Sequence, residues 1–388
     1  MKNDINSATE NKKFFVACSE FANRSNILGN ERSLFSRTSL GIGTPHSIEY
    51  VPSFVKRNKV KSTVRVPANA FNLWKYRNEL YRLLAKDEKK PIIIGIANNK
   101  GGVRKTTDTV NIAYCLNRIG FKVLVIDGDM QGDVSAFYGG YDSAKNYHQL
   151  IYDYLSNIVS NGANYDDKDI EDFIKGFIKN LPNTNIDYIS NTMSTSKLFD
   201  TIKNDYPNIY IFSLYYILEY VKKMQKYDFI FIDNSSNYAD NNALTNNVAS
   251  DFLLISTTKS NPSVKGIVQT IKEVDKLEQN RKFARGALNN HKPLEIIGCL
   301  VGNSPWTTKD ETKQWGNSLA LLKDYKLYVF GEYLPHSSTV NLSDQKTLSV
   351  LDDLFIHNGK ENPLAVSYCK IVEELLLRLI ELKGGEQR

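Results

Sequence analysis

From Ile92 onward the chain alternates between short, continuously apolar segments and longer segments with helical spacing. Strands are expected at 92–97, 122–129, 186–190, 227–233, 251–257, 294–303 and 326–330, and helices between them, for example at 106–119, 207–225 and 263–280. Strands that are apolar at every position are typical of a sheet buried on both faces, and such sheets are mostly parallel. The pattern therefore predicts an α/β fold with a parallel sheet and helices on both faces.

The first of these strands leads into the loop NNKGGVRKTT, residues 98–107, and then into a helix. Glycines allow a loop backbone to approach a phosphate closely, and the N-terminus of the following helix attracts an anion. Lys105 is expected near the β- and γ-phosphates of a nucleotide, and Thr106 at Mg²⁺. The general pattern G-x-x-x-x-G-K-[ST] is not matched, because Asn99 and Arg104 occupy its glycine positions. A simple turn between strand and helix is the alternative interpretation.

Acidic residues follow two later strands. Asp127 and Asp129 lie in VIDGDMQGD, and Asp233 lies in FIFIDNSS. In an open parallel sheet, ligands bind beyond the carboxyl ends of the strands, so all three carboxylates are expected near the loop. One carboxylate can hold Mg²⁺ through water and another can orient an attacking water. The loop and the acids together predict a site for a nucleoside triphosphate.

These motifs resemble those of the ParA/MinD group of ATPases. The loop resembles the deviant Walker A sequence K-G-G-x-G-K-[ST]-T, DGDMQGD resembles D-x-D-P-Q-G, and YDFIFIDNSS resembles a Walker B strand that ends in D-x-P-P. The resemblance extends over about residues 90–384. It implies a P-loop NTPase-like fold and an ATPase that uses ATP and Mg²⁺. It also implies a homodimer formed on ATP, DNA binding without sequence preference, and a ParB-like centromere-binding partner that stimulates hydrolysis.

The resemblance also implies roles for individual residues. Lys100 matches the lysine that reaches the partner protomer's nucleotide, and Lys105 the phosphate-binding lysine. Asp129 matches the residue that helps to activate water. The expected Mg²⁺-associated residues are Thr106, Asp127 and Asp233, and the expected ATP-binding loop comprises Lys100, Gly101, Gly102, Val103, Arg104, Lys105, Thr106 and Thr107.

Three departures from the family pattern bear on turnover. Met130 replaces a proline, Asn234-Ser235-Ser236 replaces x-Pro-Pro, and Arg104 replaces the loop glycine. If the backbone at position 104 is left-handed, a side chain there costs about 1 kcal/mol, or roughly a factor of ten in affinity. Arg104 is expected either to offer its charge to the phosphates, as an arginine finger does, or to point to solvent. ATP binding is therefore expected, while hydrolysis is left open.

The N-terminal part of the chain is basic. Residues 1–90 hold 17 Lys/Arg and 8 Asp/Glu, whereas the whole chain has a net charge of only +6. We expect two domains: a mainly helical N-terminal extension at 1–90 and the ATPase domain at 91–388. The extension is expected to contain short helices within 13–35, a hairpin or wing at 54–66 and a helix at 69–90. The larger plasmid-partition ParA proteins carry a winged helix-turn-helix that represses their own operon, although no clear helix-turn-helix signature is present here. A partly disordered, solubilising arm is the alternative.

Non-specific DNA affinity requires lysines and arginines near the phosphates. The candidates form one group before residue 66 and another near residue 283, namely Lys56, Arg57, Lys59, Lys61, Arg65, Arg281, Lys282 and Arg285. For each group an ordinary solvated surface is the alternative.

The remaining features favour a cytoplasmic, nucleoid-associated protein without stable membrane association. No apolar run approaches the roughly 20 residues of a transmembrane helix. The four cysteines are far apart, which gives no support to zinc or iron–sulfur sites. The C-terminal helix at 365–388 has acids on its polar face, so it is expected to pack on the protein's core. The rival hypotheses are a MinD-like membrane-associated ATPase and a nucleotide-binding DNA regulator with impaired hydrolysis.

Overall fold

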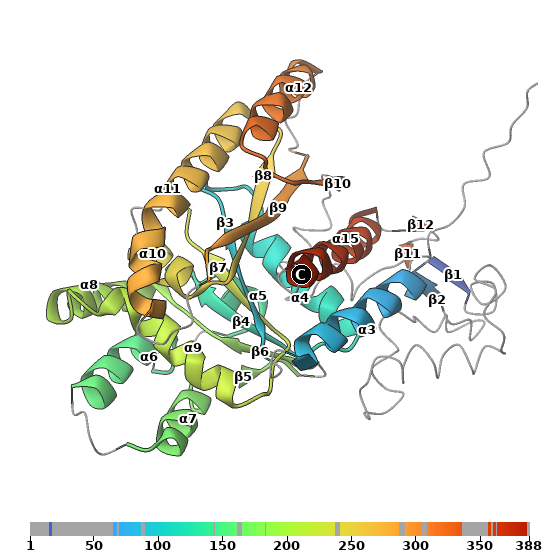
Figure 1. Ribbon diagram of the computed structural model, residues 1–388. Helices are drawn as coiled ribbons and strands as arrows, with labels where there is room; N and C mark the ends of the chain where they lie inside the picture. Colours follow the sequence, from blue (N-terminus) through green and yellow to red (C-terminus); the bar gives the residue numbers. More distant parts are fainter. Residues whose placement is uncertain are drawn as a thin grey trace, which may run out of the picture.

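The computed structural model describes residues 15–17, 65–67, 70–86, 90–140, 142, 144–160, 165–182, 184–236, 241–286, 292–303, 309–335, 356–357, 360–361 and 363–385. Its centre is an eight-stranded sheet in the order β10-β9-β8-β3-β7-β4-β6-β5 (Figure 1). The strands are β3 (Ile92–Ala97), β4 (Val123–Gly128), β5 (Lys179–Asn180), β6 (Ile186–Ile189), β7 (Phe229–Asn234), β8 (Phe252–Thr258), β9 (Glu295–Gly302) and β10 (Val329–Leu334). Within this sheet every neighbouring pair is parallel except β5 and β6.

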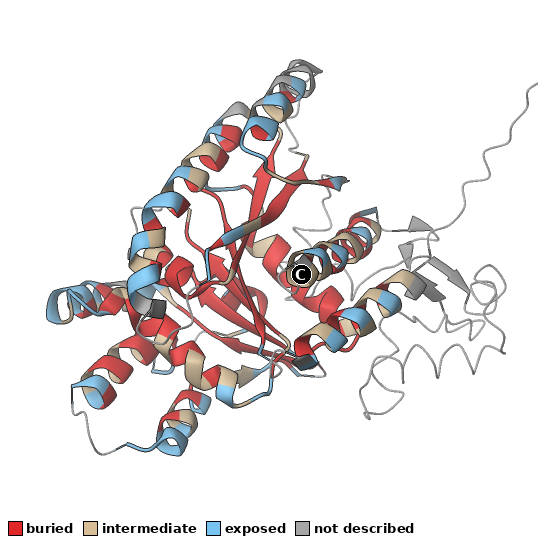
Figure 2. Ribbon diagram, in the orientation of Figure 1, coloured by how far each residue is buried: buried red, intermediate tan, exposed pale blue. Residues whose placement is uncertain are grey.

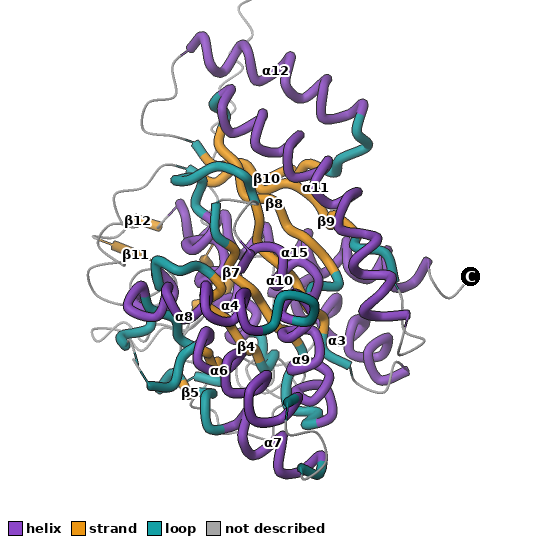
Figure 3. The backbone as a smooth tube through the Cα atoms, turned by 90° about the vertical axis from the view of Figure 1, so that its left-hand side faces the viewer, coloured by secondary structure: helices purple, strands orange, loops and turns teal. Residues whose placement is uncertain are grey.

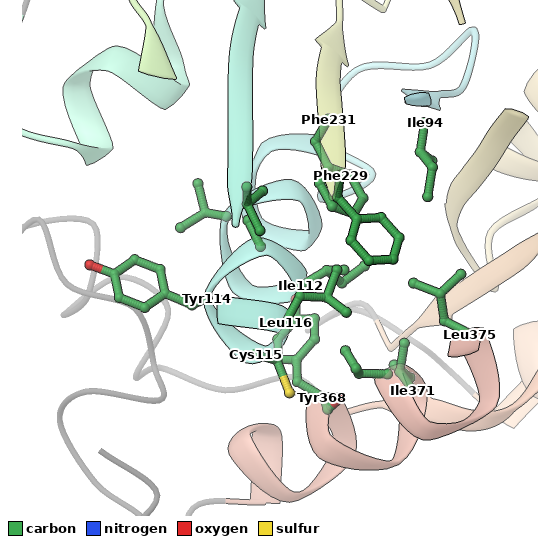
Figure 4. Close-up of a cluster of buried hydrophobic side chains, with 14 of the residues drawn as sticks. Ile94, Ile112, Tyr114, Cys115, Leu116, Phe229, Phe231, Tyr368, Ile371 and Leu375 are labelled. Atoms are coloured by element: carbon green, nitrogen blue, oxygen red, sulfur yellow. Dashed lines mark hydrogen bonds between the residues drawn. The ribbon is translucent and has the colours of Figure 1, made fainter. Parts of the chain in front are cut away.

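Three helices cover one face of the sheet: α3 (Ala70–Lys86), α4 (Lys105–Arg118) and α15 (Pro363–Gly385). Side chains alternate across a strand, so Ile92, Ile94 and Ile96 of β3 share a buried cluster with these helices. In Figure 4, Phe229 and Phe231 of β7 lie over α4, and the C-terminal helix packs beneath it. The expected docking of the C-terminal helix on the core is confirmed.

The opposite face is covered by helices from the middle of the chain (Figure 3). These include α6 (Tyr147–Asp153), a π-helical turn at Tyr154–Val159, α7 (Asp167–Lys175), α8 (Ser196–Asp205), α9 (Ser213–Lys223) and α10 (Asn241–Ala249). They enclose a second apolar cluster with Ile93, Leu124 and Ile232. Toward the β10 edge of the sheet, α11 (Asn261–Gly286) and α12 (Lys309–Asp324) form a third apolar cluster, which includes Trp315. The central strands are buried from both sides (Figure 2).

The predicted fold class is confirmed by this sheet and its two helical layers. The acidic run at 165–172 begins a helix: Asp166 caps α7 and forms a reciprocal capping box with Asp169. The strand expected at 326–330 begins three residues later in the structure. Lys326 takes a left-handed conformation with φ 54° and ends the turn after α12, so β10 begins only at Val329.

Little of the proposed N-terminal extension is described. Residues 15–17 form strand β1, which pairs antiparallel with β2 (Arg65–Pro67), where helices had been expected within 13–35. The helix expected at 69–90 is α3, and its Leu73, Leu80 and Leu84 are buried in the cluster shared with α4 and α15. Most of the expected hairpin or wing at 54–66 lies outside the described residues. The chain also has the short pair β11 (Ile356–His357) and β12 (Lys360–Glu361). Among the described residues, no helix combines the length and hydropathy needed to cross a bilayer.

Candidate functional site

The loop at 98–104 joins β3 to α4 at the carboxyl end of the sheet. Two of its residues are left-handed, Gly102 with φ 71° and Arg104 with φ 78°. Gly101 and Gly102 are exposed, whereas Val103 is buried and anchors the loop. Glycine is required at 102, where the backbone turns in a conformation that side chains disfavour. The loop thus places exposed backbone in front of the first turn of α4, as expected for a phosphate-binding loop.

Lys105 is the first residue of α4, and its side chain is only 8% exposed. Its Nζ donates to the carbonyl of Lys100 within the same loop, at 3.4 Å. Burial lowers the pKa of Lys105, and the nearby carboxylates of Asp233, Asp129 and Asp133 act against that shift. The Lys105 ammonium is therefore buried, and its hydrogen bond to the loop carbonyl is long and weak. A buried positive charge in this state is well placed to bind an anion.

Asp127 of β4 and Asp233 of β7 are direct neighbours across the two parallel strands, and both are fully buried. Asp233 accepts hydrogen bonds from the hydroxyls of Thr106, at 2.7 Å, and Thr109, at 3.2 Å. Burial raises the pKa of Asp233 to about 7, although both hydroxyls and Lys105 favour its charged form. The predicted Mg²⁺-associated residues Thr106, Asp127 and Asp233 therefore come together at one point of the sheet.

Asp127 accepts hydrogen bonds from a residue of α5 (Asp133–Phe137). One carboxylate oxygen accepts from the backbone N–H of Ser135, at 2.8 Å, and from its hydroxyl. The other, Oδ1, is buried without a hydrogen-bond partner among the described residues. Burial raises the pKa of Asp127 well above its ordinary value. A buried carboxylate oxygen left open beside Thr106 and Asp233 is chemically suited to Mg²⁺ or to one of its waters.

Asp129 and Lys100 lie at the rim of this site. Asp129 is half-buried just beyond β4, and it accepts from the backbone N–H of Gln131 at 3.0 Å. Its charge raises the pKa of both Lys105 and Asp233, so its carboxylate acts electrostatically on the site. Lys100 is exposed. Their suggested roles, water activation and contact with a second protomer, stay predictions.

Arg104 meets neither of the two expectations for it. The backbone is left-handed, as the glycine of the family pattern suggested. However, its side chain neither reaches toward the phosphate side of the loop nor enters solvent; it is 14% exposed and forms an ion pair with Asp108, Nε to Oδ1 3.7 Å. The buried carboxylate one helical turn later attracts the guanidinium. An arginine-finger role is therefore not supported by the geometry.

A family model described as an AAA domain matches residues 91–285, which is half of the chain. The chain belongs to this AAA domain family. The match begins at β3 and ends within α11, so it contains the loop and all three acids. The resemblance to ParA/MinD-type ATPases that the motifs indicate is confirmed.

Individual relatives of this AAA domain point the same way. The sporulation initiation inhibitor protein Soj of Bacillus subtilis is 34% identical over 188 residues, which are 47% of this chain and 64% of Soj. The chromosome-partitioning ATPase Soj of Thermus thermophilus is 41% identical over 66 residues, 17% of this chain and 26% of that one. Among solved structures, an McdA–ATP complex of Cyanothece has a TM-score of 0.55 at 20% identity, covering 74% of this chain and 96% of McdA. That likeness shows a shared fold.

The structure corrects one residue of the expected DNA-binding groups. Arg281 of α11 is fully buried, and its guanidinium donates to the carbonyls of Asn247, Val248, Ser250 and Lys292. It therefore holds the end of α10 in place and is not available to DNA. Lys282, the next residue, is exposed. The side chains of Arg285 and of all the candidates before residue 66 lie outside the described residues.

The site contains several residues that the sequence motifs do not predict. Thr109 and Ser135 hold the two buried acids, and Asp133 is a further acid close enough to influence Lys105. Asn191, which follows β6, donates to the backbone carbonyl of Asp129 at 3.1 Å. Asp133 could have been found as the third acid of DGDMQGD. The others are short polar side chains without a distinctive motif.

The buried acids predict a pH dependence of stability in the AAA domain without metal or nucleotide. Because the pKa of Asp233 is raised to about 7, its protonated form stabilises the fold at low pH, and this contribution is lost as pH rises toward 7. Between pH 5.5 and 8 we expect the free energy of unfolding to fall by about 2 kcal/mol more in the wild type than in Asp233→Asn. Denaturant unfolding at a series of pH values measures this difference; parallel curves for the two proteins would contradict it.

Proposed function

We propose that the chain binds Mg·ATP between the loop at 98–107 and the ends of β4 and β7, and that it hydrolyses this nucleotide. The observation that carries the proposal is the convergence of Lys105, Thr106 and Asp233 in front of an exposed glycine loop. The backbone of Gly101 to Thr107 would cradle the phosphates, with Lys105 on the β- and γ-phosphates. Lys105 is already positioned and largely desolvated, so little reorganisation is needed on binding.

The residues present fit a magnesium ion. Thr106 Oγ1 and Asp233 are 2.7 Å apart and would hold the ion together, while the open oxygen of Asp127 would accept from one of its waters. Bound Mg²⁺ would neutralise charge on the phosphates. Asp129 is the acid best placed to orient an attacking water, because it is only half-buried and lies at the rim of the site.

We further propose that ATP brings two protomers together and that the dimer binds DNA as a partition protein does. The exposure of Lys100 on the loop supports a reach toward the nucleotide of a second copy. The chromosome-partitioning role stated for the Thermus relative supports DNA segregation, and a ParB-like partner would then stimulate turnover. The remaining candidate DNA contacts are Lys282, Arg285 and the basic group before residue 66, namely Lys56, Arg57, Lys59, Lys61 and Arg65. Cytoplasmic, nucleoid-associated localisation would follow.

An ATP-dependent DNA complex is the expected result that tests this function. In gel-shift titrations with random-sequence DNA, the protein should shift DNA with Mg·ATP and much less with Mg·ADP or without nucleotide. The affinity should fall steeply with salt, since the contacts are to phosphates. Lys105→Ala is the control that separates an ATP effect from simple charge attraction. Equal shifts under all three nucleotide conditions would refute an ATP-gated DNA-binding protein.

Two rival functions give different outcomes in related assays. A membrane-associated ATPase would co-sediment with anionic liposomes in the presence of ATP; the burial of the apolar residues of α15 against α3 and α4 disfavours this. A nucleotide-binding DNA regulator would shift DNA with ATP yet release no phosphate, even with DNA present. Because the side chain of Arg104 turns away from the loop's phosphate side, we expect it not to obstruct hydrolysis, and phosphate release should be detected.

A further inference from the structure

Arg104 belongs to a buried polar cluster that the phosphate loop shares with the C-terminal helix. Its Nη2 donates to the hydroxyl of Tyr368 on α15 at 3.3 Å, and its Nη1 donates to the carbonyl of Pro335, just after β10, at 3.2 Å. The Tyr368 hydroxyl in turn donates to Asp108 Oδ1 at 2.6 Å. Asp108 and Tyr368 are almost completely buried. The cluster thus joins the loop, the first turns of α4, the end of β10 and α15.

The surroundings are shaped to accept this arginine. A Cβ on Gly302, at the end of β9, would lie 2.7 Å from Cδ of Arg104, so the absence of a side chain at 302 leaves space for the guanidinium stem. Tyr368 is fixed from the other side, because α15 crosses α4 at this point, with Cys115 next to Tyr368 (Figure 4). The hydrogen-bonding roles are complementary: the arginine only donates, the carboxylate only accepts, and the tyrosine hydroxyl does both.

A left-handed arginine is strained, and strain of this kind persists only where surrounding contacts enforce it. Here the enforcing contacts are the ion pair and hydrogen bonds of its own side chain. The residue is followed directly by Lys105, the first residue of α4, so its backbone angles set the direction in which the loop presents its N–H groups and the Lys105 side chain. Whatever fixes Arg104 therefore fixes the phosphate-binding geometry.

We propose that Arg104 is a positioning residue for nucleotide binding, which acts through Asp108 and Tyr368 and makes α15 part of the nucleotide-binding machinery. By linkage, if docking of α15 strengthens ATP binding, ATP must strengthen the docking of α15 by the same factor. The inference rests on the proposed ATP binding and is independent of DNA segregation.

The first test removes only one hydroxyl. Tyr368→Phe keeps the ring that packs between α15 and α4 but deletes the hydrogen bonds to Arg104 and Asp108. We expect the Kd for Mg·ATP, measured by calorimetry, to rise roughly tenfold. Tyr138→Phe is the matched control, because the Tyr138 hydroxyl is also buried but has no hydrogen-bond partner among the described residues. It should bind ATP as the wild type does.

The second test separates loop positioning from loop strain. Arg104→Gly relieves the left-handed strain but leaves Asp108 buried without its cationic partner, a loss that outweighs the gain. We expect weaker ATP binding, by roughly tenfold or more, and recovery to within a few fold in the double variant Arg104→Gly/Asp108→Asn, which has the loop glycine and no unpaired buried carboxylate at position 108. Tighter binding by Arg104→Gly alone would show that strain dominates and would overturn the proposal.

Hydrogen exchange of α15 distinguishes this coupling from a merely structural contact. In the wild type, Mg·ATP should slow amide exchange in residues 363–385, while α7, on the opposite face of the sheet, should not respond. In Tyr368→Phe the response of α15 to ATP should be lost. If α15 exchanges equally with and without ATP in the wild type, or if Tyr368→Phe binds ATP with unchanged affinity, the inference is wrong. A wild type that binds no ATP would overturn both the proposed function and this inference.

Discussion

Lys105→Ala is expected to raise the Kd for Mg·ATP by roughly 100- to 10,000-fold, so that binding is lost in ordinary titrations. Hydrogen bonds to charged groups are worth about 1.5–3 kcal/mol each, and the ammonium would contribute two of them, to the β- and γ-phosphates. The side chain is already buried in the loop, where its ammonium donates a hydrogen bond to the Lys100 carbonyl. It is therefore largely desolvated in the nucleotide-free protein, and ATP binding requires little further desolvation of the lysine. Calorimetry with Mg·ATP measures the effect directly.

The control for this variant is a lysine of the same charge outside the site. Lys282→Ala removes an exposed lysine from α11 and should leave ATP affinity within a factor of two. Thermal unfolding should show that Lys105→Ala remains folded; loss of the buried ammonium should also favour the protonated form of Asp233, since Lys105 lowers the pKa of that acid. Unchanged ATP affinity in a folded Lys105→Ala protein would remove the basis of the proposed function.

The sheet and the central acids could be predicted from sequence because their signals are local. A run such as Phe229–Asn234 is apolar until its last residues, which is typical of a strand buried from both sides, and the acid at its end lies where parallel strands finish. Asp127 and Asp233 consequently meet in register, although they are far apart in the chain. The same reasoning located the loop from a strand, two glycines and a following helix.

The orientation of Arg104 could not be predicted, because its decisive partner lies 264 residues away. The loop sequence suggests only phosphate or solvent as the partner of the guanidinium charge. The third destination, a buried carboxylate and a tyrosine, exists because α15 returns across α4. Asp108 alone, four residues after Arg104 on a helix, was the available local signal, and it suggests an ion pair without showing that the pair is buried.

Arg281 illustrates the same limit for surface charge. Next to Lys282 and near Arg285 it resembles a basic patch, yet α11 turns it inward to the carbonyls at the end of α10. Carbonyls at a helix end lack partners within the helix, and a guanidinium can satisfy several at once. No sequence pattern distinguishes such an arginine from an exposed one. The DNA-binding surface therefore has to be mapped by the salt-dependent binding of single variants.

Asp129→Asn is expected to lower kcat for ATP hydrolysis by roughly 10²- to 10⁴-fold while ATP still binds. Asparagine can accept the hydrogen bond from Gln131 N–H as aspartate does, so the turn after β4 should keep its shape. Only the negative charge that would orient and activate the attacking water is lost. Because that charge also repels phosphate, affinity for Mg·ATP should stay the same or rise slightly. Phosphate release under saturating ATP, together with calorimetry, separates the two effects.

The matched control is Asp142→Asn, because Asp142 likewise accepts backbone N–H groups of its own turn, those of Ala144 and Lys145, but lies outside the site. It should hydrolyse ATP at the wild-type rate. The Asp129→Asn protein should in turn remain on DNA once loaded with ATP, since the ATP-bound dimer is the form proposed to bind DNA. A kcat within a few fold of the wild type would exclude Asp129 as the residue that activates water and would shift that role to Asp133, an exposed acid whose charge also acts on Lys105.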